Sequence, residues 1–125
     1  MRITTFAAIY IGSYEISMKI FELSAKRKIR EIDHIRHRIE IGKDAYAKGD
    51  IGSELTEELC DVLAEYVKIM DGYKVTAYKA CASAAIRAAK NELFILDRIK
   101  RRTGLEVEVL SNSEHRFVSY ESVAV

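Results

Sequence analysis

The sequence predicts an α/β domain with a mixed five-stranded sheet and the element order β-β-β-α-β-α-β-α. Up to residue 41, apolar residues either run together or alternate with polar ones, which is typical of strands. Beyond that point, segments with helical spacing are each followed by a short apolar segment. Strands reached across a helix pair in parallel, so we expect a meander of three strands extended by two parallel strands.

The first two strands are separated by a tight turn. Residues 3–11 are almost continuously apolar, as expected of a central strand that is covered on both faces. Gly12 and Ser13 interrupt this run, and glycine permits a sharp reversal of the chain there. Alternation with polar residues then predicts a returning second strand, whose apolar positions are Ile16, Met18 and Ile20.

The third strand is predicted over residues 35–41, where every second residue faces one side of the sheet. Ile32 falls on the wrong parity for that strand, which predicts a bulge near Asp33. The charged residues 26–28 are predicted to form the preceding hairpin turn, and residues 42–53 a loop. The positions that define the strand are Ile35, His37, Ile39 and Ile41.

Two helices and two strands are predicted next. Thr56, followed by two acids, is the predicted N-cap of the first helix, and Gly72 is its predicted end. Its core-facing positions are Leu59, Val62, Leu63, Tyr66, Val67 and Met70. Residues 74–82 are the predicted fourth strand.

Ser83 is predicted to open one long helix that Gly104 ends, with Arg101 and Arg102 in its last turn. The predicted core face of that helix consists of Ala85, Ile86, Ala89, Leu93, Leu96 and Ile99. Residues 105–109 form the predicted fifth strand, and a last helix is predicted to begin after residue 113.

Composition limits the class of protein. A chain of 125 residues fits one domain from residue 1 to residue 125, and its net charge of +1 gives no indication of a nucleic-acid or membrane partner. Cys60 and Cys81 lie far apart without zinc-type spacing, which favours a reduced, cytoplasmic setting. The N-terminal apolar run is too short for a signal peptide, and no stretch reaches membrane-spanning length. Because the chain stops inside a predicted helix, we expect this domain to belong to a longer protein.

Three polar segments are predicted to meet at the carboxyl ends of the strands, where open α/β sheets bind ligands. The turn at Gly12 and Ser13 presents backbone N–H groups that suit a phosphate, although such turns also serve as plain hairpins. Ser83 and Arg87 would offer a hydroxyl and a guanidinium fork to phosphate oxygens. They equally fit a helix cap and a solvated arginine. Glu114, after the last strand, is placed as a general base or simply as an acid in a first helical turn.

Other polar residues are weaker candidates. His34 and His37 lie three apart on a strand and point to opposite faces, so they cannot share a metal ion. Arg36 and Arg38 lie on one strand face and fit a solvated edge. No metal site is therefore predicted from the spacing of these residues.

In their order and spacing, the three segments resemble the N-terminal domain of the exopolyphosphatase/guanosine pentaphosphate phosphohydrolase (Ppx/GppA) family. The family pattern A-I-D-x-G-S-N-S corresponds to AIYIGSYE at residues 8–15. A-T-S-A-L-R-x-A-x-N corresponds to ASAAIRAAKN at 82–91, and V-I-S-G-x-E-E to VLSNSEH at 109–115. The element order likewise matches a ribonuclease H-like (actin-like ATPase) half-domain, although an unrelated α/β domain of the same order fits the pattern too.

The resemblance implies a role for each matching residue. Gly12 and Ser13 would form a phosphate loop, Ser83 and Arg87 would hold the polyphosphate chain, and Glu114 would activate the attacking water. It further implies Mg²⁺ as cofactor, inorganic polyphosphate or guanosine pentaphosphate as substrate, and a missing C-terminal domain of the same chain as partner. We expect the isolated domain to fold, to bind polyphosphate weakly and to show no hydrolysis. The sequence is compatible with a homodimer and does not decide the oligomeric state.

Several family positions are altered. Tyr10 stands in place of an aspartate that can serve a metal ion, and Tyr14 in place of an asparagine. Glu15 replaces a hydroxyl residue and would repel a phosphate if it faced the cleft. His115 replaces a second glutamate, and Asn112 replaces a glycine, a milder change because asparagine tolerates left-handed backbone.

Three functional hypotheses follow from these residues. The first is a phosphoanhydride hydrolase that releases terminal phosphate, with Glu114 as its base. The alternative is a catalytically degenerate regulator that binds phosphate or a nucleotide, which Tyr10 and Glu15 favour. A sugar kinase of the same superfamily is the third, and the Arg87 segment argues against it. The sequence does not decide between polyphosphate and guanosine pentaphosphate.

Overall fold

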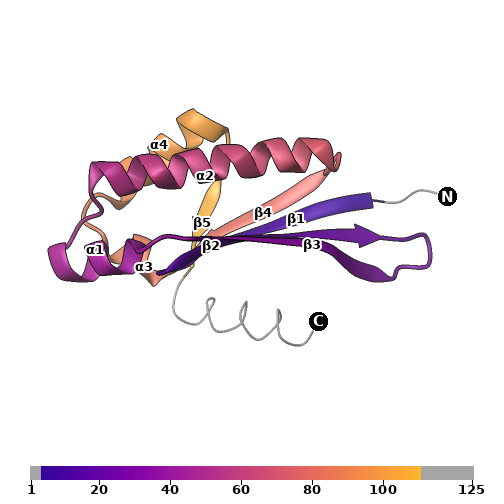
Figure 1. Ribbon diagram of the computed structural model, residues 1–125, viewed down its shortest axis with the longest axis horizontal. Helices are drawn as coiled ribbons and strands as arrows, with labels where there is room; N and C mark the ends of the chain where they lie inside the picture. Colours follow the sequence, from indigo (N-terminus) through magenta and orange to yellow (C-terminus); the bar gives the residue numbers. More distant parts are fainter. Residues whose placement is uncertain (1–3, 111–125) are drawn as a thin grey trace.

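The computed structural model describes residues 4–110 and shows a sheet with α2 and α4 lying over one of its faces (Figure 1). The strands are β1 Thr4–Ile11, β2 Glu15–Leu23, β3 Ile29–Arg38, β4 Ala77–Ala82 and β5 Val107–Val109. The helices are α1 Ile41–Lys48, α2 Ser53–Gly72, α3 Ala84–Ala88 and α4 Glu92–Thr103. The predicted last helix lies outside the described residues.

The predicted mixed sheet of five strands is confirmed. Its strand order is β3-β2-β1-β4-β5, with antiparallel pairing from β1 to β2 and β3 and parallel pairing from β1 to β4 and β5. The parallel strands are each reached across helices, which places the carboxyl ends of β1, β4 and β5 at one edge. The hairpin between β2 and β3 lies at the other end of the molecule (Figure 1).

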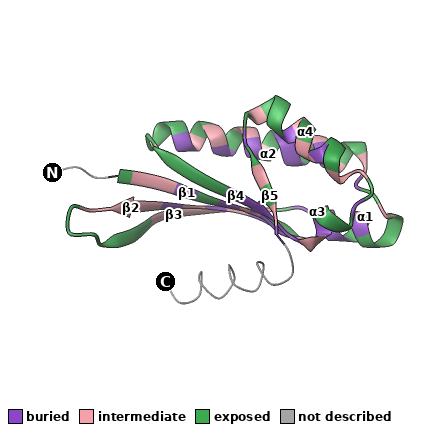
Figure 2. Ribbon diagram, turned by 180° about the vertical axis from the view of Figure 1, so that it is seen from behind, coloured by how far each residue is buried: buried purple, intermediate pink, exposed green. Residues whose placement is uncertain are grey.

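The core lies between the sheet and its helices, because one face of each long strand is apolar. Figure 2 shows buried residues along α2 and in the strand ends near α1 and α3. The opposite face of β1 carries Phe6, Ala8 and Tyr10, and Ala8 is exposed. The expectation that this strand is covered on both faces is therefore not met by the described residues. The buried strand positions on the helical side are Ala7, Ile9, Ile11, Ile16, Met18 and Ile20.

The β2–β3 hairpin follows the prediction at its bulge and at its turn. The register shifts between Ile20, which pairs with Asp33, and Phe21, which pairs with Glu31, so Ile32 is the extra residue. Residues 26–28 form the predicted turn, in which Arg27 has a positive φ of 58°.

The end of the third strand and the loop after it were predicted wrongly. β3 stops at Arg38, and residues 42–53 contain helix α1 instead of continuous loop. Ile41 and Ala45, one helical turn apart, are buried with 0% and 3% exposure. Their burial against the core stabilises a helix that the weak local pattern around Gly42 does not indicate.

The start of α2 also differs from the prediction. Gly52 is the N-cap, and Thr56 lies inside the helix, where its hydroxyl donates to the Gly52 carbonyl at 2.9 Å. α2 ends at Gly72 as predicted, but Lys74 takes the left-handed conformation, with φ 56°, so β4 begins only at Ala77. The predicted core stripe is confirmed, since the buried residues include Leu59, Leu63, Tyr66 and Met70.

The single long helix predicted after Ser83 is two helices. Ser83 is confirmed as an N-cap, because its Oγ accepts a hydrogen bond from the Ala85 N–H at 3.3 Å. The helix stops because Ala89 has an extended ψ of 133°, and α4 then starts in a new helical phase. Leu93 is consequently 81% exposed, contrary to prediction, while Ile95 takes its place in the core.

The last strand begins later than predicted. Gly104 ends α4 with φ 79°, as expected of a C-terminal glycine. β5 then covers only Val107–Val109, although Leu105, the predicted first residue of the strand, is buried.

Tyr66 ties α2 to the sheet, and this contact predicts a stability change at high pH. The buried Tyr66 hydroxyl donates to the Ile16 carbonyl at 3.0 Å, and burial, helped by the charge of Glu15, raises its pKa to about 12. Between pH 10 and 12 the unfolded phenol has lost its proton while the folded one keeps it. The free energy of unfolding should therefore fall by about 2 kcal/mol as the pH rises through this window.

Urea unfolding at several pH values checks this prediction. Tyr66→Phe should lose about 1 kcal/mol at pH 7, because the hydrogen bond is absent and the Ile16 carbonyl lacks its donor. The stability advantage of the wild-type protein over Tyr66→Phe should then shrink above pH 10 and reverse by about pH 12. A constant difference across that range would contradict the assignment.

Candidate functional site

The predicted convergence at the carboxyl edge of the sheet is confirmed for its described members. Ile11, at the end of β1, pairs with Ala82 at the end of β4, which pairs with Val109 in β5. The ladder continues beyond the strands, because the Ser83 N–H donates to the Ile11 carbonyl at 2.9 Å. The Leu110 N–H likewise donates to the Ala82 carbonyl at 3.1 Å. Glu114 and His115, together with Asn112, lie outside the described residues.

The turn after β1 has room only for glycine at its first position. The Gly12 N–H donates to the Glu15 carbonyl at 2.8 Å and closes the hairpin. A Cβ at position 12 would lie 2.9 Å from that same carbonyl oxygen and 3.3 Å from the Tyr10 ring. The turn is therefore a tight hairpin, and the Gly12 N–H is already used within it.

Helix α1, which the sequence analysis missed, holds this turn from the side. The Gly42 N–H donates to the Ser13 carbonyl at 2.7 Å, and the Ile39 N–H donates to the Tyr14 carbonyl at 3.1 Å. A Cβ on Gly42 would lie 2.9 Å from the Ser13 Cβ, so the helix approaches the turn as closely as glycine allows. The spacing of Ile41 and Ala45 before Gly49, which ends α1 with φ 83°, was the available sequence signal.

Asn91, the last residue of the second motif, fastens the α1–α2 connection to the α3–α4 junction. Its Oδ1 accepts from the Ile51 N–H at 3.1 Å, and its Nδ2 donates to the Ile51 carbonyl at 2.9 Å. The Lys90 N–H also donates to the Gly49 carbonyl at 2.8 Å. The motif thus contributes a structural clamp that keeps α1 beside the site.

Ser83 and Arg87 lie at the start of α3, next to the turn. Ser83 is only 4% exposed and caps the helix, which is the structural role expected for it. Arg87 is not simply solvated, because its Nη1 donates to the Leu110 carbonyl at 2.8 Å. The arginine is thereby fixed against the end of β5.

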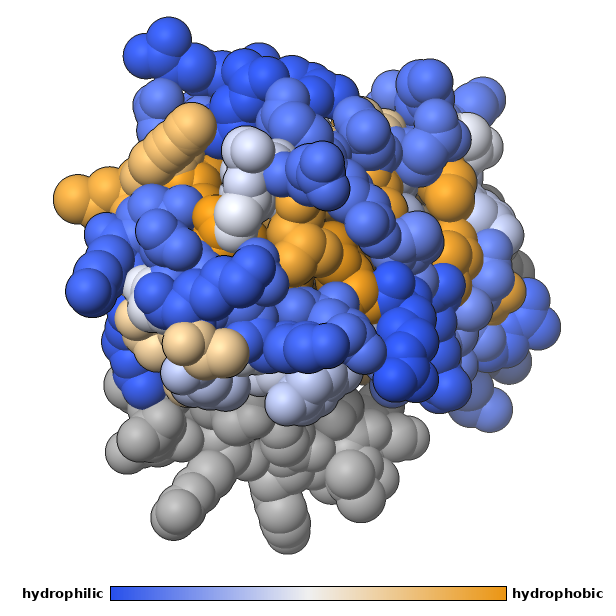
Figure 3. Space-filling model, turned by 60° about the vertical axis from the view of Figure 1, so that its left-hand side comes forward, coloured by the Kyte–Doolittle hydropathy of each residue, from blue (hydrophilic) through white to orange (hydrophobic). Residues whose placement is uncertain are grey.

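Three altered family positions lie in the described part of the chain: Tyr14 is in the turn, Tyr10 is near the end of β1, and Glu15 is the first residue of β2. Tyr10 is half-buried, and burial, followed by the charges of Cys81 and Tyr46, raises the pKa of its phenol. Tyr14 and Glu15 are exposed. The end of the molecule that carries α1 is largely hydrophilic, with separate apolar areas (Figure 3).

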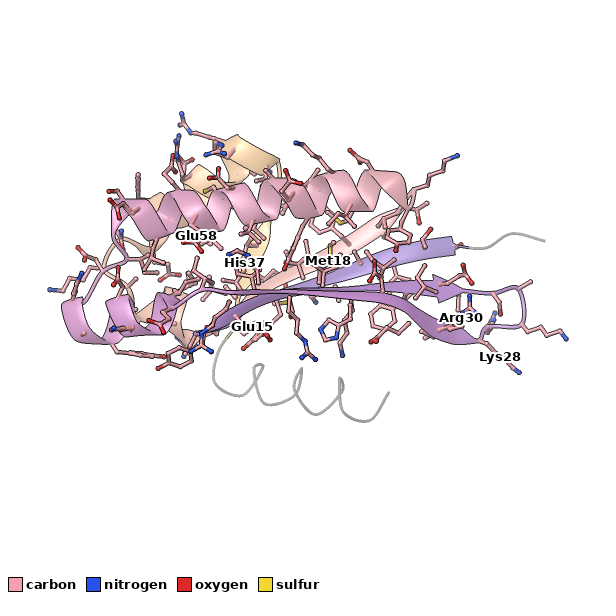
Figure 4. The ribbon with its side chains drawn as sticks, viewed as in Figure 1. Glu15, Met18, Lys28, Arg30, His37 and Glu58 are labelled. Atoms are coloured by element: carbon pink, nitrogen blue, oxygen red, sulfur yellow. The ribbon has the colours of Figure 1, made fainter. Side chains whose placement is uncertain are left out.

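Glu15 lies away from the helices, on the other face of the sheet (Figure 4). It borders a hollow of about 390 Å³ together with Tyr10, Cys81 and basic side chains, namely Lys19, Arg36 and Lys79. Lys19 pairs with Glu31 at 3.6 Å, and Lys79 pairs with Glu108 at 3.5 Å. Glu15 is also the first residue of β2, directly after the turn, so repulsion between its carboxylate and a phosphate at the turn stays a prediction.

The two histidines occupy opposite faces, as predicted. His37 lies between β3 and α2, where its Nε2 is 3.0 Å from Glu58 Oε2 (Figure 4). His34 borders the hollow on the other face. Within residues 4–110, no three His, Cys, Asp or Glu side chains are grouped closely enough to hold a metal ion.

Two further findings concern the described part of the chain. Cys60 and Cys81 are both buried, and no disulfide joins them. Over the same residues, no helix combines the length and apolar character needed to cross a membrane.

Comparison with known proteins gives a consistent set of relatives. The model of the Ppx/GppA phosphatase family matches residues 20–125. A guanosine-5'-triphosphate,3'-diphosphate pyrophosphatase from Photobacterium profundum is 30% identical over 129 residues, covering 95% of this chain and 24% of the relative. The chain therefore spans about a quarter of the length of this curated relative.

Solved structures show the same relationship. The Ppx/GppA family member from Aquifex aeolicus is 36% identical, with a TM-score of 0.85, over 89% of this chain and 36% of that one. An exopolyphosphatase from Cytophaga hutchinsonii, 24% identical with a TM-score of 0.82 over 88% of this chain and 35% of its own, shares the fold. These likenesses confirm the predicted half-domain fold.

Proposed function

The chain belongs to the Ppx/GppA phosphatase family, and on this premise we propose that it is the N-terminal domain of a phosphoanhydride hydrolase. The hydrolase would release terminal phosphate from inorganic polyphosphate or guanosine pentaphosphate. The observation that carries the proposal is the meeting of the Gly12 turn, Ser83 and Arg87 at one edge of the sheet. This chain covers 36% of the length of the Aquifex relative, so we propose that a second domain of the same protein completes the cleft.

Phosphate binding would use groups whose orientation the fold already fixes. The Ser13 peptide is held by Gly42 and the Tyr14 peptide by Ile39, so N–H groups in the turn would meet the phosphate without reorganising. Arg87, in α3, would add a charge-assisted hydrogen bond to a phosphate oxygen. Ser83 already accepts from Ala85, and its hydroxyl hydrogen remains the donor for a phosphate oxygen.

Hydrolysis would use Glu114 as the general base. In that step Glu114 takes a proton from water, the water oxygen bonds to the terminal phosphorus, and the bridging P–O bond breaks to release orthophosphate. Leu110, which accepts the Arg87 hydrogen bond, precedes Glu114 by four positions. Arg87 is therefore tied to the start of the segment that carries the proposed base, and it would neutralise charge on the phosphoryl group.

Mg²⁺ would supply further neutralisation of phosphate charge when bound. The described residues do not form a dedicated carboxylate site for it, and Tyr10 offers a phenol where the family pattern has an aspartate. Mg²⁺ often keeps several waters and binds through substrate phosphates, which suits such a site. No step of the proposed hydrolysis is assigned to the ion.

Family membership and the likeness to a guanosine-5'-triphosphate,3'-diphosphate pyrophosphatase support the hydrolase over the degenerate regulator and the sugar kinase. We place the protein in the cytoplasm, in keeping with its two buried cysteines that form no disulfide with each other.

Phosphate release by the full-length protein tests the proposed function. With magnesium present, it should release orthophosphate from polyphosphate, guanosine pentaphosphate or both, and Arg87→Ala should reduce this at least tenfold. Arg36→Ala, which changes an exposed arginine on β3, is the matched control and should leave the rate unchanged. If the folded protein binds these compounds but releases no phosphate, the regulator is correct and the hydrolase is not.

A further inference from the structure

Three tyrosines surround the proposed phosphate turn. Tyr10 precedes its glycine by two positions, Tyr14 lies in the turn, and Tyr46 projects from α1. Tyr14 is 56% exposed and Tyr46 is 59% exposed. Large aromatic side chains left this open beside a polar turn are typical of binding surfaces, because a phenol ring is apolar on its faces and polar at its tip.

The glycines of the site bring two of these rings close to the turn. A Cβ on Gly42 would lie 3.4 Å from Cε2 of Tyr46 and 2.9 Å from the Cβ of Ser13. Tyr46 follows Gly42 by one helical turn, so its ring lies over the bare face of that glycine and next to Ser13. The Tyr10 ring lies 3.3 Å from the Cβ position of Gly12.

Rings in these positions would serve a ligand that carries a ring of its own. Inorganic polyphosphate presents only charged oxygens and has no ring that could stack on a tyrosine. A nucleobase has two π faces, and base–aromatic stacking strengthens binding by about tenfold or more for one base. Tyrosine also adds no negative charge next to the phosphates, and the raised pKa of Tyr10 keeps that phenol neutral.

We propose that Tyr14 and Tyr46 form a stacking surface for the base of a nucleoside polyphosphate whose phosphates lie at the Gly12 turn. Tyr10 forms the inner wall of this surface. The inference rests on the proposed phosphate-binding role of the turn and deepens it, because it assigns the site to nucleoside polyphosphates rather than to inorganic polyphosphate. The family pattern has an aspartate at the position of Tyr10 and an asparagine at the position of Tyr14. Relatives that follow this pattern therefore lack these two tyrosines of the proposed surface.

Two ligands that differ only by a nucleoside test the proposal on the full-length protein. GTP and inorganic tripolyphosphate share the triphosphate, and their dissociation constants are measured by equilibrium titration. Tyr14→Ala and Tyr46→Ala should each weaken GTP binding about tenfold and leave tripolyphosphate binding within about twofold. Tyr46→Phe, which keeps the ring, should bind GTP like the wild type. Tyr73→Ala, at the far end of α2 (Figure 1), is the matched control and should change neither constant.

Three other outcomes would contradict either the stacking surface or the phosphate-binding role of the turn. Equal weakening of both ligands would mean that the tyrosines only support the turn, and unchanged GTP binding would mean that no base stacks there. Either result overturns the stacking surface and leaves the phosphate turn intact. Failure of the wild-type protein to bind tripolyphosphate would instead overturn the proposed function of the turn, and the stacking surface with it.

Discussion

Replacing Glu114 with glutamine in the full-length protein should lower the rate of phosphate release by about 10²- to 10⁴-fold. Glutamine keeps the size of the side chain but cannot take a proton from the attacking water. The phosphate contacts that we propose for Ser13, Ser83 and Arg87 stay in place, so the dissociation constant for tripolyphosphate should change less than about threefold. A loss of turnover without a loss of binding is the expected signature of a general base.

The matched control is Glu108→Gln in β5. Glu108 is exposed and pairs with exposed Lys79 at 3.5 Å, so the loss of its charge should have little effect on either binding or turnover. Measurement of kcat and of the dissociation constant for both variants separates the two roles. If Glu114→Gln retained the wild-type kcat, the base would have to be another residue.

The strands and helix ends were predictable where the pattern is local. Alternation in β2, the parity of Ile32 and the capping by Ser83 depend on neighbouring residues only, and the structure confirms each of them. Helix α1 has only a weak local signal, the spacing of Ile41 and Ala45 before Gly49. Its eight residues include a glycine, and its stability comes from burying Ile41 and Ala45 against segments distant in sequence.

The break between α3 and α4 has the same kind of cause. The alanine-rich sequence favours one continuous helix, but Asn91 and Lys90 form hydrogen bonds to the α1–α2 connection instead. These tertiary bonds interrupt the helix and change its phase, which exposes Leu93.

In the candidate site too, some features follow from the sequence pattern and others depend on tertiary contacts. Topology alone brings Gly12 and Ser83 to one edge, because parallel strands end together. The contact between Gly42 and Ser13 and the bond from Arg87 to Leu110 join segments that no local pattern relates. A site of this kind can therefore be located from sequence, whereas the residues that hold it in place cannot.

Gly42→Ala offers the clearest test of that support, because helix propensity and packing predict opposite results. Alanine in a helix is favoured over glycine by about 1 kcal/mol, so propensity alone predicts a more stable protein. The added Cβ, however, would lie 2.9 Å from the Ser13 Cβ and 3.3 Å from the Ser13 carbonyl oxygen. Relief of this overlap must move α1 or the turn, and overpacking of this kind costs about 1–3 kcal/mol.

We expect Gly42→Ala to unfold at lower urea concentration than the wild type and to bind tripolyphosphate at least tenfold more weakly, since the turn N–H groups are displaced. Gly72→Ala is the matched control, because a Cβ at the end of α2 would meet no atom within 4 Å. That variant should gain up to about 1 kcal/mol and bind tripolyphosphate like the wild type. Were both variants equally stable and equally active, Gly42 would not be required for the approach of α1 to the turn. A stable Gly42→Ala protein that had lost only its phosphate affinity would mean that the turn, and not the helix, gives way.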